Sequence, residues 1–238
     1  MQSIEEIEIM KRIVHIFLII LFAVPFFCQT KLFAVDYPII SFGINGGYGQ
    51  SPLAKGASGR AFLRYSLEAY IPGFQIEIGY ASSFYTVLKD TVIQNPDETA
   101  ESRKIKTGIN DGYPVISGTF HLSPFGESTT IYFGGGGQFH LLSVIRSTTD
   151  RYWDDVAEKY QETEIEKVTL LDQTKFGFHL LGGVRIALGK FGSLDFEARQ
   201  TFVNVSQNDW QDEEAKQLWG EKKWDNFSAN VGLTIYIF

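Results

Sequence analysis

Ionisable side chains recur at alternate positions of several segments of the sequence, opposite runs of apolar residues. Arg64 and Glu68, for example, alternate with Leu63, Tyr65 and Leu67. Alternate side chains of a strand point to opposite faces, so one face would be apolar and the other charged. Buried charges must be paired, which predicts a salt-bridge network. Eight residues form this candidate charge network: Arg64, Glu68, Glu77, Lys175, Arg185, Asp195, Glu197 and Arg199.

Three histidines, His121, His140 and His179, share the parity of these charged residues. Three imidazoles could hold zinc, and a histidine beside a carboxylate could assist hydrolysis. Their spacing matches no metal motif, and the sequence contains neither G-x-S-x-G nor H-E-x-x-H. We therefore expect interior histidines with hydrogen-bond partners, and no catalytic residue, metal or cofactor.

Eight expected strands would position these residues, and the last one, Asp225 to Phe238, shows the alternation most clearly. One of its faces is wholly apolar, from Phe227 to Ile237, and a strand of about ten such residues suits a transmembrane barrel. Only Phe62 interrupts the polar row of its segment, and Gln200 interrupts an apolar row. The expected strands cover residues 40–48, 60–69, 74–86, 112–122, 131–141, 175–188, 194–202 and 225–238.

The expected connections alternate in length along the chain. Those after the second, fourth and sixth strands are short turns, whereas the others are longer and polar: Gly49–Gly59, Val87–Asp111, Ser143–Gln173 and Ser206–Trp224. In a barrel whose two ends lie on one side, short turns face the periplasm and long loops face outside. A soluble β-sandwich would not require this asymmetry.

Two features stand out in the long connections. Residues 162–170 alternate, which predicts that the sixth strand continues above the membrane as a hairpin with residues 143–149 and offers open strand edges to a partner. The acidic loops also carry large aromatic residues, which either form a surface for adhesion or divalent cations or simply accompany solubilising charge: Trp153, Tyr160, Trp210, Trp219 and Trp224.

Composition and charge limit the remaining classes. The formal net charge of −7 argues against a nucleic-acid partner, which would call for a basic surface. At the start of the chain, Lys11 and Arg12 precede the apolar run Ile13–Phe27, which predicts a signal peptide over residues 1–34, with Met10 as an alternative start. An acylated Cys28 and a permanent N-terminal membrane helix are the two rival interpretations of this segment. Residues 35–238 would then form one barrel domain.

Taken together, the strand number, the loop asymmetry and the terminal sequence VGLTIYIF give residues 39–238 a resemblance to the small eight-stranded outer-membrane β-barrels of the OmpA/OmpX type. The resemblance implies an all-β, antiparallel, up-and-down transmembrane barrel with long outer loops and short periplasmic turns. It also implies a monomer in the Gram-negative cell envelope, with membrane lipid and the outer-membrane assembly machinery as partners, the latter through the C-terminal strand. Phe238 departs from the family pattern, because Ile237 carries the lipid-facing parity that the family's terminal aromatic usually has.

The expected role is structural or interactional, through the outer loops. The first alternative is a narrow, porin-like path for ions or small solutes, gated by rearranging ion pairs. The second is a lipid-modifying enzyme, although the sequence shows no Ser/His/Asp grouping that resembles those barrels. A soluble lipocalin-like barrel would need an apolar interior, which the charges on the inward parity argue against.

Overall fold

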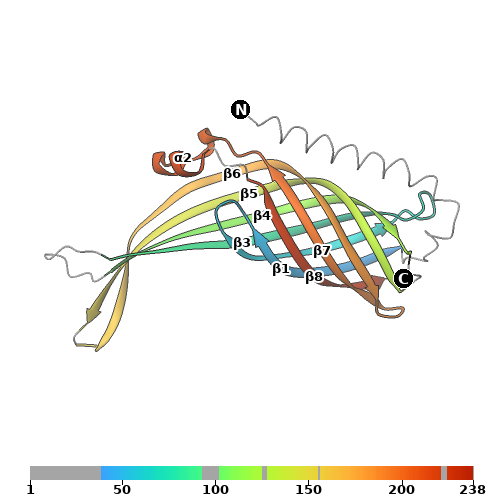
Figure 1. Ribbon diagram of the computed structural model, residues 1–238, viewed down its shortest axis with the longest axis horizontal. Helices are drawn as coiled ribbons and strands as arrows, with labels where there is room; N and C mark the ends of the chain where they lie inside the picture. The colour runs from blue at the N-terminus through green and yellow to red at the C-terminus, as the bar shows by residue number, and fades with distance from the viewer. Residues whose placement is uncertain (1–38, 93–101, 125–127, 155, 221–223, 238) are drawn as a thin grey trace.

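In the computed structural model, eight antiparallel strands form a closed barrel in which each strand pairs with its neighbours in sequence and β8 closes on β1 (Figure 1). The structure describes residues 39–92, 102–124, 128–154, 156–220 and 224–237. The predicted signal peptide and Phe238 lie outside these residues. The prediction of an all-β, eight-stranded, up-and-down barrel is confirmed. The strands are β1 (Ile40–Gln50), β2 (Lys55–Ser66), β3 (Phe74–Val92), β4 (Ser102–Leu122), β5 (Thr129–Asp154), β6 (Lys159–Ala187), β7 (Gly192–Val203) and β8 (Asn226–Ile237).

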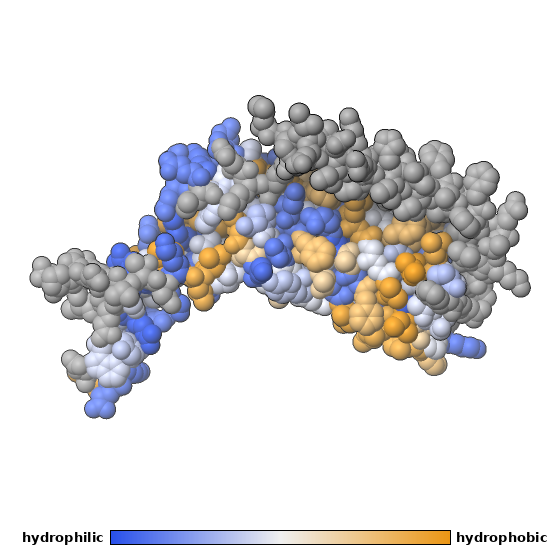
Figure 2. Space-filling model, viewed as in Figure 1, coloured by the Kyte–Doolittle hydropathy of each residue, from blue (hydrophilic) through white to orange (hydrophobic). Residues whose placement is uncertain are grey.

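The two-residue alternation of the sequence becomes the two faces of the barrel wall. In β2, the side chain of Leu63 points outward and the residue is 53% exposed, whereas its neighbour Arg64 points inward and is 3% exposed. Large apolar residues are exposed in the same way on every strand. On the face seen in Figure 2, apolar side chains cover much of the wall, and hydrophilic ones dominate the projecting end. The predicted arrangement of apolar residues outside and charged residues inside is therefore confirmed.

Strand pairing extends into three of the four segments that are predicted as long outer connections. The connection between β1 and β2 contains only residues 51–54, since Gln50 pairs with Lys55. Most of the segments 87–111 and 143–173 is strand, because β3 to β6 extend well past the ends of β1 and β2. The asymmetry between the two ends of the barrel is thus mainly a difference in strand length.

The extended parts of β3, β4, β5 and β6 form a sheet that projects from one end of the barrel, which we call the projecting sheet (Figure 1). The β5–β6 hairpin runs to the pair Asp154–Lys159, so the predicted protruding hairpin is confirmed and is longer than expected. Register shifts interrupt the pairing at Val144/Ile145 and at Thr148/Thr149. Such bulges increase the local twist and bend of a strand.

The connection between β7 and β8 folds back and covers the mouth of the barrel at the end that carries the projecting sheet. It contains the 3₁₀ helix η2 (Gln207–Asp209) and the short helix α2 (Glu213–Trp219), whose N-terminus is capped by Asp212 accepting from Ala215 N at 2.9 Å. No described helix is long and apolar enough to cross a membrane. We call the described part of this connection, residues 204–220 and 224–225, the mouth cap. It packs against side chains of β3 to β7. The buried apolar residues of the resulting cluster are Tyr85, Ile109, Leu142, Val144, Leu170, Leu171, Val203, Val205, Trp210, Ala215 and Trp224.

The tryptophans of the last loop fit neither of the two predicted interpretations, a surface for adhesion or cations and an accompaniment of solubilising charge. Trp210 and Trp224 are buried, and Trp219 packs against the cluster, with the rings of Trp210 and Trp219 centred 5.4 Å apart. Of the five aromatic residues singled out in the loops, Trp153 and Tyr160 remain exposed, in edge-to-face contact at the tip of the projecting sheet. Burial of apolar rings, rather than ligand contact, explains the tryptophans of the last loop.

The glycine run of β5 allows neighbouring backbones to approach closely. A Cβ atom built on Gly136 would lie 1.8 Å from the carbonyl oxygen of Ile116, whereas one on Gly137 would meet only the ring of Phe176, at 3.3 Å. The near neighbour at Gly136 is thus the backbone of β4, which can approach because Gly136 has no side chain.

Candidate functional site

Four arginines and three carboxylates meet in the barrel interior and form a buried charge cluster, which consists of Arg60, Arg64, Arg185, Arg199, Glu77, Asp195 and Glu197. All seven residues are nine-tenths or more buried. They come from β2, β3, β6 and β7, because each lies at an inward position of its strand. The structure thus brings together six of the eight residues of the predicted network and adds Arg60, which the sequence interpretation had not included.

Glu77 joins the two arginines of β2. Its Oε2 accepts from Arg64 Nε at 2.9 Å, and its Oε1 accepts from Arg60 Nη1. Arg64 and Glu77 are also direct cross-strand partners in the β2–β3 register. A carboxylate shared between two guanidinium groups offsets part of the cost of burying all three charges.

Asp195 connects β7 to β2, β6 and β8. It accepts hydrogen bonds from Arg64 Nη1 at 2.8 Å, Arg185 Nε at 2.9 Å and Thr234 Oγ1 at 2.7 Å, and Ser193 Oγ donates to it at 3.2 Å. These contacts span the interior rather than one wall. They tie opposite sides of the barrel together at the end that carries the short turns.

Glu197 and Arg199 complete the cluster nearer to the mouth. Glu197 accepts from Arg60 Nη2 at 2.7 Å and from Arg199 Nε at 3.3 Å. The Nη2 atom of Arg199 lies 3.7 Å from Glu77, which is too far for a hydrogen bond. Of the four arginines in the cluster, Arg199 therefore has the weakest contacts with carboxylates among the described residues.

The aromatic interruption of the polar row, Phe62, lies inside this cluster. The guanidinium carbons of Arg60 and Arg64 lie 4.5 and 4.2 Å from the centroid of its ring. A π face near two desolvated cations stabilises them, so Phe62 follows the inward parity for an electrostatic reason. Gln200 lies half-buried on the outward parity of β7, and nothing in the structure explains it.

Two members of the predicted charge network lie elsewhere. Strand β2 ends at Ser66, so Glu68 belongs to the following turn and not to an inward strand position. Lys175 lies at the mouth, where its Nζ donates to Asp209 of η2 at 2.6 Å. Burial would raise the pKa of Asp209, but hydrogen bonds from Lys175 and Ser206 outweigh it, so the pKa lies below its ordinary value. Lys175 thus fastens the mouth cap instead of joining the interior cluster.

The three histidines are buried but separate, each with its own hydrogen-bond partner. His121 contacts Thr119 Oγ1 at 2.9 Å, and His179 contacts Ser117 Oγ at 2.9 Å. The described part of the chain contains no group of three His, Cys, Asp or Glu side chains that could hold a metal ion. The arrangement matches the expected hydrogen-bonded interior histidines.

His140 has a partner that the sequence interpretation missed. Its Nδ1 lies 2.7 Å from Asp111 Oδ1, and its Nε2 lies 2.7 Å from Gln138 Nε2. Asp111 also accepts from Asn226 Nδ2 at 3.2 Å. The sequence predicts a connection over residues 87–111, which contains Asp111. The contact between His140 and Asp111 would follow only from a fourth strand that begins before Gly112.

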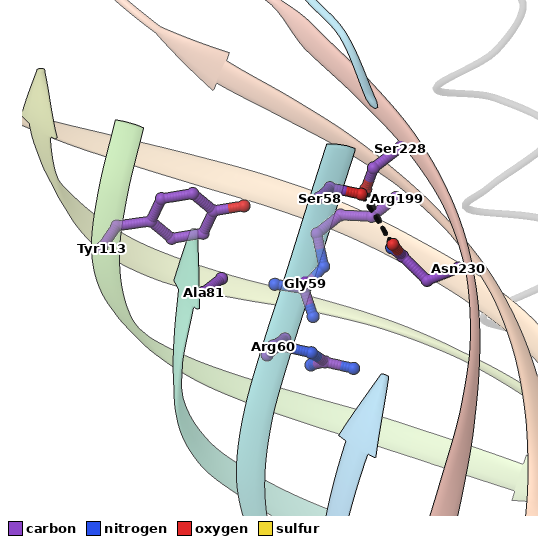
Figure 3. A pocket seen from close by; sticks show the side chains of 8 residues that line it. All are labelled: Ser58, Gly59, Arg60, Ala81, Tyr113, Arg199, Ser228 and Asn230. Atoms are coloured by element: carbon purple, nitrogen blue, oxygen red, sulfur yellow. Dashed lines mark hydrogen bonds between the residues drawn. The ribbon is translucent and has the colours of Figure 1, made fainter. Parts of the chain in front are cut away.

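A small cavity opens above the charge cluster, between β2, β4, β7 and β8 (Figure 3). Its volume of about 10 Å³ is enough for one water-sized species. Arg60, Arg199, Tyr113 and Asn230 are among the residues that line it. An organic molecule does not fit in this cavity.

No family model and no curated protein sequence matches the chain. Among solved structures, it is similar to a major outer membrane protein from Thermus thermophilus, with 13% identity and a TM-score of 0.49 over 82% of this chain and 98% of that one. It is also similar to Neisserial surface protein A, with 13% identity and a TM-score of 0.42 over 83% of this chain and 96% of the other. Ail, the attachment invasion locus protein of Yersinia pestis, gives 10% identity and a TM-score of 0.37 over 82% and 95%. All three scores are below 0.5, so the case for a membrane location rests on the residues of this chain.

Proposed function

We propose that this protein is a bacterial outer-membrane β-barrel that reaches its membrane after export and displays the projecting sheet as an interaction surface. The observation that carries the proposal is the apolar exterior of a closed barrel with a charged interior. One exposed large apolar residue from each strand illustrates it: Phe42, Leu63, Ile78, Ile116, Phe139, Phe178, Phe196 and Leu233.

Such an exterior suits lipid and not water. Soluble monomers rarely expose contiguous apolar patches larger than a few hundred Å². In lipid, backbone polar groups must be paired within the protein, and a closed ring of strands meets this requirement. Because the ring closes between β1 and β8 of the same chain, the arrangement also supports a monomer, with β8 available to assembly machinery until closure.

The interior supports a structural or interactional role more strongly than a porin-like one. The charge cluster crosses the barrel from β2 to β7, and the mouth cap covers one end with packed tryptophans. A solute would have to break several charge-assisted hydrogen bonds in order to pass. We therefore favour interaction outside the membrane over conduction through the barrel.

The projecting sheet offers the element through which such an interaction would occur. From Lys159 to Thr169, β6 pairs with β5 on one side, and no described strand pairs with its other side. An unpaired edge can accept a strand from a partner through backbone hydrogen bonds. Glu162, Glu164 and Glu166 lie along this edge, so its complement is an extended segment that carries basic side chains.

The membrane assignment is tested by refolding the chain in detergent and into phospholipid vesicles. We expect heat-modifiable gel mobility and protection of the barrel from protease in vesicles. A chain that folds in buffer without detergent or lipid would contradict the assignment. Planar-bilayer recordings of the wild type and of charge-swap variants at Arg185 and Glu197 should be silent, and discrete conductance steps would favour the pore instead.

The interaction surface is tested with a short peptide of alternating lysine and valine residues as the probe. Fluorescence anisotropy should show binding to the folded protein that Glu164→Lys weakens. Glu213→Lys on α2 makes the same charge change away from the edge and should leave binding unchanged. Equal losses in both variants would indicate general charge attraction and would contradict strand addition at β6.

A further inference from the structure

The small cavity above the charge cluster has several hydrogen-bonding side chains in its lining. Its polar lining comes from three strands besides β2: Tyr113 on β4, Arg199 on β7, and Ser228 and Asn230 on β8. In Figure 3 the Tyr113 hydroxyl points toward Ser58 and Arg199, while Arg60 lies below. Gly59 and Ala81 contribute apolar surface to the rest of the lining, so the polar groups meet an occupant from a few directions only.

Arg199 supplies the strongest indication of what that occupant is. A guanidinium has five N–H donors, and Arg199 uses its Nε–H on Glu197 at 3.3 Å. The side chain is only 2% exposed, and neither of its Nη atoms has a hydrogen-bond acceptor in the described structure. Buried charged donors that lack acceptors are costly, so an acceptor beside Arg199 would remove a substantial penalty.

The charge balance of the cluster favours an anion as that acceptor. Four arginines face three carboxylates, which leaves one positive charge in excess. Another buried carboxylate of the interior, that of Asp111, is already engaged by His140 and Asn226. A neutral water would satisfy donors but would leave the excess charge uncompensated in a desolvated interior.

The neighbouring amide and hydroxyl groups add a further donor. Ser58 Oγ donates to Asn230 Oδ1 at 2.7 Å, and Asn230 Nδ2 donates to Ser228 Oγ at 3.1 Å. The acceptor oxygen of Asn230 is thereby engaged in the hydrogen bond with Ser58. Ser228 accepts from Asn230 and keeps its own proton available for an occupant.

We propose that this cavity binds one monatomic, monovalent anion of the halide class, held by the Nη groups of Arg199. The small space favours a monatomic ion over larger anions such as sulfate and phosphate. The anion neutralises the excess charge of the cluster and thereby stabilises the closed interior. This binding would operate whether or not the projecting sheet has a partner.

Bromide is the probe, because its anomalous scattering identifies it directly. In crystals of the detergent-folded full chain grown with sodium bromide, we expect one anomalous peak within hydrogen-bonding distance of Arg199 Nη1 or Nη2. Arg199→Gln should lose this peak. Arg146→Gln removes an arginine that pairs with Glu214 outside the interior and should retain it. Density for water alone at the site in the bromide crystals would overturn the proposal.

Thermal unfolding provides a second readout in solution. At constant ionic strength, replacing gluconate with chloride at about ten times its dissociation constant should raise the melting temperature of the wild type by roughly 3 °C. The shift should vanish in Arg199→Gln. If that variant does not fold, Tyr113→Phe keeps every charge and should weaken halide binding about tenfold through the lost donor. A wild-type melting temperature that is the same in chloride and gluconate would count against the proposal.

Discussion

Replacing Glu77 with glutamine removes one negative charge from the centre of the barrel and changes almost nothing in shape. Glu77 accepts hydrogen bonds from Arg60 and Arg64, and its loss raises the excess positive charge of the cluster from one to two. Hydrogen bonds to charged groups contribute about 1.5–3 kcal/mol each. Breaking a buried ion pair by removing one partner costs about 3–5 kcal/mol. We therefore expect Glu77→Gln to lower the free energy of unfolding by about 3–5 kcal/mol.

Urea-induced unfolding from phospholipid vesicles measures this loss. With a slope of about 2–3 kcal/mol per molar urea, the midpoint should fall by roughly 1–2.5 M. The exposed Glu213→Gln is the matched control and should change stability by less than about 0.5 kcal/mol. Adding Arg64→Met to Glu77→Gln returns the net charge of the cluster to its wild-type value, so the double variant should lose less than the sum of the single losses. A Glu77→Gln loss below about 1 kcal/mol, or strict additivity in the double variant, would refute the electrostatic account of the interior.

Three further predictions concern the lipid face, the glycine run and the projecting sheet. Leu63→Arg should cost about 2–4 kcal/mol in vesicles, and Leu63→Ala clearly less, because only the arginine places a charge in lipid; equal costs would contradict lipid contact. Gly136→Ala should abolish folding, as read by gel mobility, whereas Gly137→Ala should fold, since only the first places a Cβ 1.8 Å from a carbonyl oxygen; folding of both would show that the backbones can separate. The hydrogen bond from Arg103 lowers the pKa of Asp150, so their pairing contributes stability above the ordinary carboxyl pKa and loses it as the pH falls through the lowered value. Arg103→Gln should raise the pKa of Asp150 in a carboxyl NMR titration, and an unchanged value would assign the shift to another group.

The parity of the barrel wall could be predicted from the sequence because it is a local property. Leu63 and Arg64 are neighbours, and their opposite directions follow from strand geometry alone. The pairing of Arg64 with Glu77 also follows once the β2–β3 turn is placed. The contact between Arg64 and Asp195 does not, because it crosses the interior and depends on the stagger of all eight strands.

The errors have physical causes of the same kind. Asp111 was missed because polar residues near it suggested a loop, whereas neighbouring strands extend the pairing beyond the barrel and override that preference. The mouth cap was missed because composition cannot tell whether Trp210 folds back onto the barrel or faces solvent. In the sequence Phe62 is an irregularity in a polar row, whereas in the fold its ring lies against two guanidinium groups.

The seam between β1 and β8 has a consequence for how the protein is made. Ile40, near the start of the described chain, pairs with Ile237, near its end. The ring can therefore close only when β8 is available to pair with β1. Contacts this distant in sequence also form slowly, because a large loop entropy must be lost first. Closure of β8 on β1 thus depends on the longest-range pairing in the barrel, which makes it a slow step of folding.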